Sequence, residues 1–90
     1  MNEKKINICN KIESCISMIN EEIDLHLQNK EADGDVETLE AIKVELERMK
    51  ISMSPEVFYP TYDYILRDAL WDYMKISDKL LDAYYSYINL

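Results

Sequence analysis

The chain has 90 residues and a formal net charge of −8, with 48 % hydrophobic and 31 % charged residues. This length allows one domain with an adequate core, and the composition argues against wholesale disorder. One glycine and two prolines are too few for the many turns of an all-β protein. We therefore expect a single all-α domain over residues 1–90.

The negative charge is concentrated in the middle of the chain. Residues 21–47 hold ten acidic residues against two lysines, whereas the segments on either side are close to neutral. An acidic chain without a basic stripe is not expected to bind nucleic-acid phosphates directly, and it is expected to attract basic protein partners. The alternative is that the acidity serves only to keep a small protein soluble.

The two cysteines and the N-terminal residues bear on the compartment. Cys9 and Cys15 are too far apart on a helix to form a disulfide, and their spacing matches neither a zinc site nor a redox motif. We expect both to be small core residues in a reducing compartment. The N-terminus lacks the apolar region of a signal peptide, and no apolar run approaches a membrane span of ~20 residues. These features predict a cytoplasmic protein without membrane contact.

Two helices are expected in the first half of the chain, at residues 4–27 and 36–50. Apolar residues recur there every three or four positions, which is helical spacing. The stripes consist of Ile8, Ile12, Cys15, Ile19 and Ile23, with Ile16 and Leu27 beside them, and of Leu39, Ile42, Leu46, Met49 and Met53. The only glycine, Gly34, lies between the helices, and Asp35 is a suitable N-cap for the second. The pattern indicates an antiparallel helical hairpin.

A joint at residues 51–60 separates the hairpin from an aromatic-rich C-terminal part. Ser54-Pro55-Glu56 favours a short helical turn, and Pro60 disfavours helix just before it. Helices are expected at 61–75, capped by Thr61, and at 77–89, capped by Ser77. Their stripe is Tyr62, Leu66, Ala69, Tyr73, Ile76, Leu80, Tyr84 and Tyr87, widened by Leu70 and Ile88. Because the stripe passes residue 76 without a phase change, one long helix is the alternative. The whole chain is predicted to be a small bundle of three to four helices.

Three C-terminal residues fall outside this stripe. Tyr64, Arg67 and Trp71 lie on the opposite side of the predicted helix, and these residue types are enriched at binding hot spots. Tyr85 joins them if the two C-terminal segments stack suitably. The alternative places Trp71 in the core of a helix buried on two sides. In the partner-binding interpretation, carboxylates of the acidic segment, namely Asp33, Asp35 and Glu37, steer the basic partner to this site.

Motifs for catalysis or metal binding are incomplete. Residues 29–40 resemble an EF-hand loop at Glu31, Asp33, Gly34 and Glu40, but Asn29 replaces the first carboxylate. The alternative is an acidic turn that caps a helix. Glu22 and the only histidine, His26, give two ligands and not a metal site. No activated nucleophile is visible, so we expect neither an enzyme nor a cofactor, and a calcium-responsive module stays an alternative.

In size, helix number, the acidic segment 21–47 and the paired Tyr84-Tyr85, the chain resembles the small acidic all-α immunity proteins of bacterial toxin–immunity pairs. Phage-type inhibitors and antitoxins share this general description. The resemblance implies a cytosolic, non-enzymatic protein that blocks a basic toxin by charge complementarity and aromatic anchors. A further alternative is a structural subunit that forms a homodimer through its tyrosine-rich face.

Overall fold

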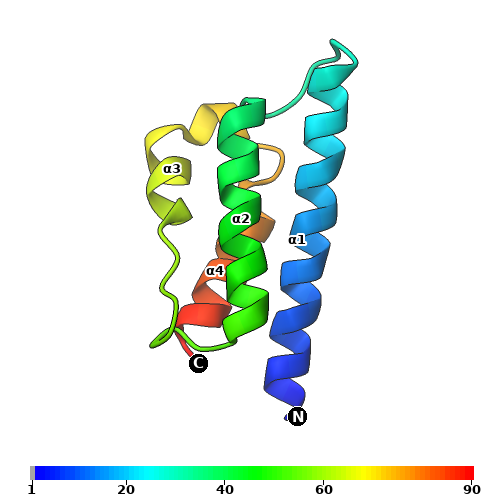
Figure 1. The fold of residues 1–90 in the computed structure, drawn as a ribbon. Helices are drawn as coiled ribbons and strands as arrows, with labels where there is room; N and C mark the ends of the chain where they lie inside the picture. The colour runs from blue at the N-terminus through cyan, green and yellow to red at the C-terminus, as the bar shows by residue number, and fades with distance from the viewer. Residues whose placement is uncertain (1) are drawn as a thin grey trace.

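The computed structural model describes residues 2–90, and these residues form helices with no β-strand. The elements are α1 (Glu3–Leu27), α2 (Val36–Ser52), α3 (Tyr62–Asp68), the short 3-10 helix η1 (Leu70–Tyr73) and α4 (Ser77–Ile88). Figure 1 shows α1 and α2 running antiparallel, with α4 beside them and α3 on the side facing away from α1. The prediction of a small all-α bundle is confirmed. Each helix of residues 2–90 is too short or too polar for a membrane span.

The predicted helical hairpin is confirmed, with bounds that differ from those expected by one or two residues. The Asn2 side chain accepts a hydrogen bond from the Lys5 amide at 2.8 Å and caps α1. Asp35 caps α2 as predicted, since its carboxylate accepts from the Thr38 amide at 2.9 Å and from the Thr38 hydroxyl at 3.0 Å. The second helix continues to Ser52, so the joint begins at Met53, which is in the left-handed conformation with φ 47°.

The apolar stripes expected from the sequence form the core. The buried residues are Ile8, Ile12, Cys15, Ile19, Leu39, Ile42, Leu46, Met49, Tyr62, Leu66, Tyr73, Ile76, Leu80, Ala83, Tyr84 and Tyr87. Four other residues assigned to the stripes or beside them, Ile16, Ile23, Met53 and Ile88, are half-buried and pack against this core. Three more differ near the helix ends: Ala69 is only half-buried, and Leu27 and Leu70 are exposed. All three stand next to a chain reversal, where the helical register that the stripe requires is interrupted.

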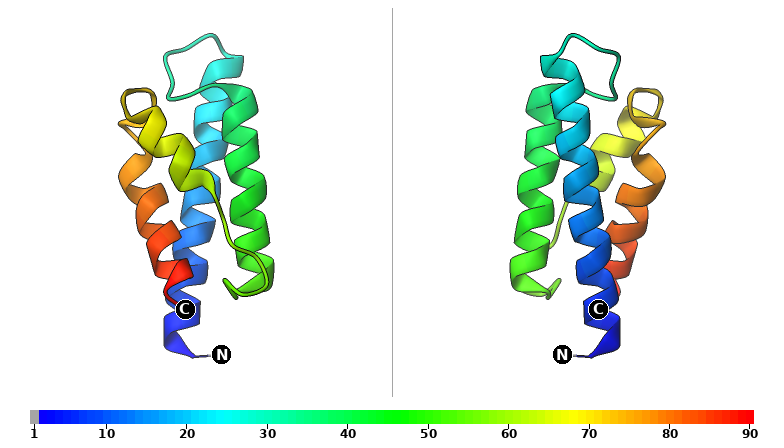
Figure 2. Two further views of the ribbon diagram at one scale, coloured as in Figure 1. Left: turned by 90° about the vertical axis from the view of Figure 1, so that its left-hand side faces the viewer. Right: turned by 90° about the vertical axis from the view of Figure 1, so that its right-hand side faces the viewer.

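The predicted helix 61–75 is wrong in its length. The α-helix ends at Asp68, because Ala69 adopts φ −125° and ψ 40°, and the chain continues as one turn of 3-10 helix. The chain then reverses, so that α4 lies antiparallel to α1 (Figure 2). Residues before and after the break still point into one core: the Tyr62 hydroxyl donates to the Leu80 carbonyl, and the Tyr62 and Tyr84 rings meet edge to face at 5.3 Å. The single long helix is excluded, and the last helix begins at Ser77 as expected, although the helix before it already ends at Asp68.

The predicted caps of the C-terminal helices are also wrong. Thr61 makes no capping bond to α3, and its amide and hydroxyl both donate to Glu45 of α2 at 2.9 Å. Ser77 is buried inside the first turn of α4 and does not cap it. Ser54-Pro55-Glu56 forms a turn, as expected, but no helix. Both helices therefore begin on tertiary contacts and not on a local side-chain cap.

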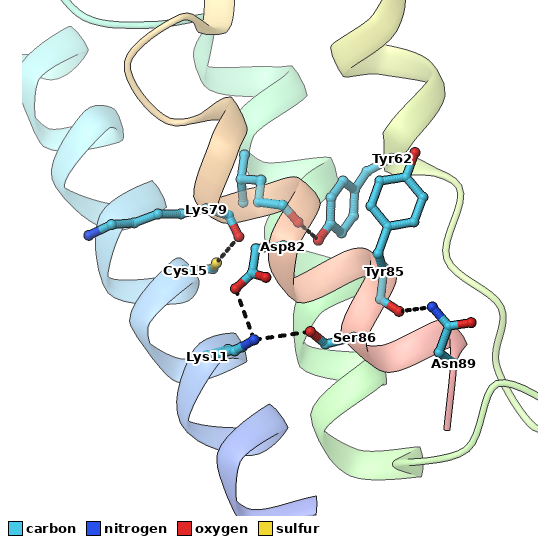
Figure 3. A network of polar contacts seen from close by, with 9 residues as sticks. Lys11, Cys15, Tyr62, Lys79, Asp82, Tyr85, Ser86 and Asn89 are labelled. Atoms are coloured by element: carbon cyan, nitrogen blue, oxygen red, sulfur yellow. Dashed lines mark hydrogen bonds and ion pairs between the residues drawn. The ribbon is translucent and has the colours of Figure 1, made fainter. Parts of the chain in front are cut away.

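Cys15 behaves as the predicted core residue, whereas Cys9 is only half-buried. The Cys15 thiol donates to the Lys79 carbonyl of α4 at 3.4 Å, as Figure 3 shows. Burial raises the pKa of the Cys15 thiol to about 11, so it stays protonated and unreactive near neutral pH. In the same view Lys11 contacts Asp82 at 3.0 Å and Ser86 at 3.1 Å, which fastens α1 to α4.

Candidate functional site

The acidic loop between α1 and α2, residues 28–35, is fixed against the turn that enters α4. One Asp33 oxygen accepts hydrogen bonds from the backbone amides of Lys75 at 2.8 Å and Ile76 at 3.2 Å. The Gly34 amide donates to the Asp72 carbonyl at 2.8 Å. A charge-assisted bond from a backbone amide to a carboxylate is one of the stronger hydrogen bonds in proteins. The two loops therefore form one rigid end of the bundle, which is the upper end in Figure 1.

A buried carboxylate in the last two turns of α1, that of Glu22, supports this junction from the interior of the bundle. Glu22, with 2 % of its surface exposed, accepts from the Asp33 amide at 3.0 Å and forms an ion pair with Lys75 at 2.9 Å. The hydrogen bond to Glu22 raises the pKa of Lys75, so the ammonium stays charged. His26 places its Nε2 atom 2.9 Å from the Asp33 carbonyl. Glu22 and His26, weighed above as a ligand pair, thus hold the acidic loop.

Gly34 sits where no other residue fits. Its φ is +65°, in the left-handed region. A Cβ atom added there would lie 2.5 Å from Cε1 and 2.7 Å from Cζ of Tyr73, and the Tyr73 ring is buried. The single glycine of the chain therefore lets the acidic loop close directly onto η1.

A hollow opens on the outer surface of this junction, and we call it the Trp71 hollow. Its lining residues are Glu31, Ala32, Asp33, Gly34, Trp71, Asp72 and Lys75. Trp71 is 84 % exposed, although tryptophan is usually well covered in a folded domain. Leu70 and Met74, on the same turn, are 50 % and 61 % exposed. One short turn thus presents three large apolar side chains to solvent beside a set of carboxylates.

Some of the charged residues around the hollow take part in ion pairs, and others do not. Among residues 2–90 the ion pairs use Lys11, Lys50, Arg67 and Lys75 as cations. None of those pairs includes Glu31, Asp33 or Asp72, whereas Lys75, the lining cation, is already paired with Glu22. The residues that line the hollow therefore carry a net negative charge. Their one cation, Lys75, is already paired with the buried Glu22. A cation outside the chain meets attraction here that is not already satisfied by a lysine or arginine of the chain itself.

A second group of polar side chains lies where α3 meets α4. Arg67 forms an ion pair with Asp63 at 3.3 Å and donates to the Tyr85 hydroxyl at 2.9 Å. Tyr85 thus lies beside Arg67, as expected for two C-terminal segments that stack. Tyr64, on the same helix, is 70 % exposed. Arg67, Tyr64 and Tyr85 thus form a polar, aromatic surface, held in place by the largely buried Asp63.

The expected partner-binding residues divide into three groups. Trp71 is on the surface, not in the core, and stands at the hollow; Tyr64, Arg67 and Tyr85 stand at the α3–α4 contact. Two acids meant to steer a partner also have structural contacts, because Asp33 holds the turn into α4 and Asp35 caps α2. Glu37 is exposed in the first turn of α2. The break at Ala69 separates Trp71 from the helical face of Tyr64 and Arg67.

Sequence reasoning missed part of the hollow. Glu31, Asp72 and Lys75 come from two distant loops, and only the folded junction brings them together. Leu70 was assigned to the buried stripe and is exposed. The sequence held one indication of an exposed apolar surface. Leu70, Trp71 and Met74 are more large apolar side chains than a single stripe can bury, and they stand beside the charged Asp72.

The loop does not take the form of the calcium loop considered above. Asn29 has φ 57° and lies two residues beyond the end of α1 at Leu27, and the carboxylates of Asp33 and Asp35 accept backbone hydrogen bonds. No group of three or more His, Cys, Asp or Glu side chains within residues 2–90 is placed to hold a metal ion. The arrangement matches the alternative stated with the motif, an acidic turn that caps a helix.

Comparisons with protein-family models, with curated protein sequences and with solved structures find no match for this chain.

Proposed function

We propose that this chain is a non-enzymatic protein-binding module that inhibits a basic partner, with the Trp71 hollow as the principal docking surface. The observation that carries the proposal is the 84 % exposure of Trp71 beside Glu31 and Asp72. Burying a large apolar side chain contributes a free energy on the order of 2–3 kcal/mol, and an exposed tryptophan does not gain it in the free protein. The hollow and its apolar neighbours supply a place where a partner can recover that free energy.

The support beneath the hollow favours binding. Asp33 is tied to the turn into α4, and Glu22 holds both Asp33 and Lys75 from below. Trp71 lies on a short 3-10 turn directly before the turn that Asp33 holds, so its backbone does not have to be ordered when a partner arrives. A preorganised anchor loses less conformational entropy on binding, which leaves more of the contact energy as affinity.

The charge of the chain supplies the second part of the proposal. The excess of acids in residues 21–47 includes Glu31 and Asp33 at the hollow and Glu37 near it in sequence. Such a field raises the rate of encounter with a basic partner and weakens as salt screens it. An inhibitor of a basic toxin, comparable to the immunity proteins that the chain resembles, acts in this way within a cytoplasm. In this proposal Tyr64, Arg67 and Tyr85 provide further contacts at the α3–α4 surface.

Self-association through a tyrosine face, the alternative function, has little surface to use. Tyr62, Tyr73, Tyr84 and Tyr87 are all buried, and only the remaining three tyrosines are exposed. The calcium alternative is likewise not favoured, because Asp33 and Asp35 are engaged with backbone amides.

The test compares two exposed apolar residues, Trp71 of η1 and Ile51 in the last turn of α2. After affinity capture of a partner from the native host, binding is measured for Trp71→Ala and for Ile51→Ala, a matched control whose side chain is 85 % exposed. We expect Trp71→Ala to weaken binding by about 2 kcal/mol or more and Ile51→Ala by less than about 0.5 kcal/mol. Urea unfolding of both variants should stay within about 0.5 kcal/mol of the parent protein.

Three outcomes bear against the proposal. Equal binding of the two variants removes Trp71 as an anchor, and a loss of stability in Trp71→Ala assigns it a structural role. If capture yields no protein other than the chain itself, and light scattering shows a dimer, the self-association alternative is preferred.

A further inference from the structure

We infer that the Trp71 hollow receives an arginine side chain of the partner, stacked on the Trp71 indole and paired with the carboxylates of Glu31 and Asp72. The inference rests on the proposed function and names the chemical group that the docking surface recognises. It follows from the exposed indole, from the lining carboxylates that form no ion pair within residues 2–90, and from Lys75, the lining cation that is already paired with Glu22.

The charges that line the hollow indicate that its occupant is a cation. Glu31, Asp33 and Asp72 all line the hollow and take part in none of the ion pairs within residues 2–90. Lys75 does not neutralise them, because it is bound to the buried Glu22 at 2.9 Å. A carboxylate or phosphate of a partner is repelled here, whereas a cation gains from several charges that the chain leaves uncompensated.

The exposed indole indicates that the cation approaches an aromatic face. Trp71 is the only tryptophan of the chain, and the indole is the side chain that attracts cations most strongly over its ring. With 84 % of its surface exposed, Trp71 has room for a group to cover it. The polar lining of the hollow disfavours an apolar ligand, which leaves carboxylates unsatisfied when it is buried.

The shape of the guanidinium group favours arginine over lysine. A guanidinium group is planar, so it stacks on an indole while its edge donates two parallel hydrogen bonds to a carboxylate. Asp72 follows Trp71 directly in sequence, and Glu31 reaches the same hollow from the acidic loop. Lysine, a compact and strongly hydrated point charge, uses only part of this arrangement. The exposed Leu70 and Met74 are available to apolar residues that flank the arginine.

The single tryptophan provides the readout. The indole N–H of Trp71 gives one resonance in the NMR spectrum of the full chain, and that resonance is followed during titration with a blocked Gly-Arg-Arg-Gly peptide at low salt. The comparison peptides replace both arginines with lysine or with uncharged citrulline. We expect a saturable shift with the arginine peptide, binding weaker by about three-fold or more with lysine, and no shift with citrulline.

Matched charge variants locate the site. The double variant Glu31→Gln/Asp72→Asn should weaken the arginine peptide by about five-fold or more. The double variant Glu40→Gln/Glu47→Gln removes the same charge from exposed positions of α2 and should weaken it by less than about two-fold. Equal binding of the lysine and arginine peptides, equal losses in the two double variants, or no shift of the indole resonance would each overturn the inference.

Failure of this inference differs from failure of the proposed function. If the arginine peptide leaves the indole resonance unmoved but Trp71→Ala still weakens the captured partner, the docking surface stands and its occupant is not arginine. If the peptide binds as expected but the partner tolerates Trp71→Ala, the arginine site stands and the proposed function falls.

Discussion

The junction between the acidic loop and the turn into α4 uses carboxylates in opposite ways on its inner and outer faces. On the inner face, Asp33 gives its carboxylate to the backbone amides of Lys75 and Ile76, and the buried Glu22 supports it. On the outer face, Glu31 and Asp72 stand beside the exposed Trp71. The inner carboxylates determine where the loop lies, whereas the outer ones are free of ion pairs within residues 2–90.

This difference separates structural charge from charge that serves recognition. The acidic residues of one segment look alike in the sequence. In the structure, a carboxylate that accepts a hydrogen bond from a backbone amide uses part of its hydrogen-bonding capacity inside the fold. Substitutions on the inner face should therefore destabilise the protein, and substitutions on the outer face should leave stability unchanged and alter binding. The predictions below test that division, beginning with the largest expected effect on stability.

The largest effect is expected at Gly34. Gly34→Ala forces a left-handed conformation on alanine and drives its Cβ into the buried Tyr73 ring, at 2.5 Å from Cε1. We expect the free energy of unfolding to fall by about 3 kcal/mol, measured by urea denaturation. In a Tyr73→Leu background the clash is relieved, and Gly34→Ala should then cost only about 1 kcal/mol. The same cost in both backgrounds would show that the contact with Tyr73 is not the cause.

A smaller loss is expected when the inner face loses its support. Glu22→Ala removes the acceptor of the Asp33 amide and leaves Lys75 without its partner. We expect destabilisation by about 2 kcal/mol, measured by urea denaturation. Glu21→Ala, at the exposed neighbouring position, is the matched control and should change stability by less than about 0.5 kcal/mol. Similar losses in the two variants would mean that general charge, and not the junction, sets the effect.

The sequence predicted the hairpin well because local rules suffice for it. The stripes of α1 and α2 have helical spacing, and Asp35 has the side chain and position of an N-cap. Their ends are determined within a few residues of the chain itself. The correct prediction of both helices follows from that local control.

The C-terminal half was predicted only in part. Its stripe identified most of the buried residues, among them Tyr62, Leu66 and Tyr73, because periodicity reports which side chains face a core. Periodicity does not report that the helix stops at Ala69, since α3 and α4 continue the same spacing after the chain has reversed. The contacts that fix the reversal, from Asp33 to Lys75 and Ile76, join residues far apart in sequence.

The candidate site shows the same limit. Trp71, Tyr64 and Arg67 were selected from sequence because they fall outside the apolar stripe, and the structure exposes all three. Their expected single surface is divided, since the break at Ala69 turns Trp71 toward the acidic loop. The sequence did not predict that Glu31 and Asp72 lie beside Trp71, because only the folded junction brings them together. Residue type indicated the anchors, and tertiary contacts determined their neighbours.

Trp71 is proposed to be a surface anchor for the partner, and the fluorescence of Trp71 tests this role. The chain has one tryptophan, so acrylamide quenching reports on Trp71 alone in the free protein and in urea, and also in the complex when the partner's tryptophans are replaced by phenylalanine. With 84 % of the side chain exposed, quenching of the free protein should approach that of the unfolded chain and should fall sharply when the partner binds. An indole already shielded in the free protein, or one quenched equally with and without the partner, would contradict the account.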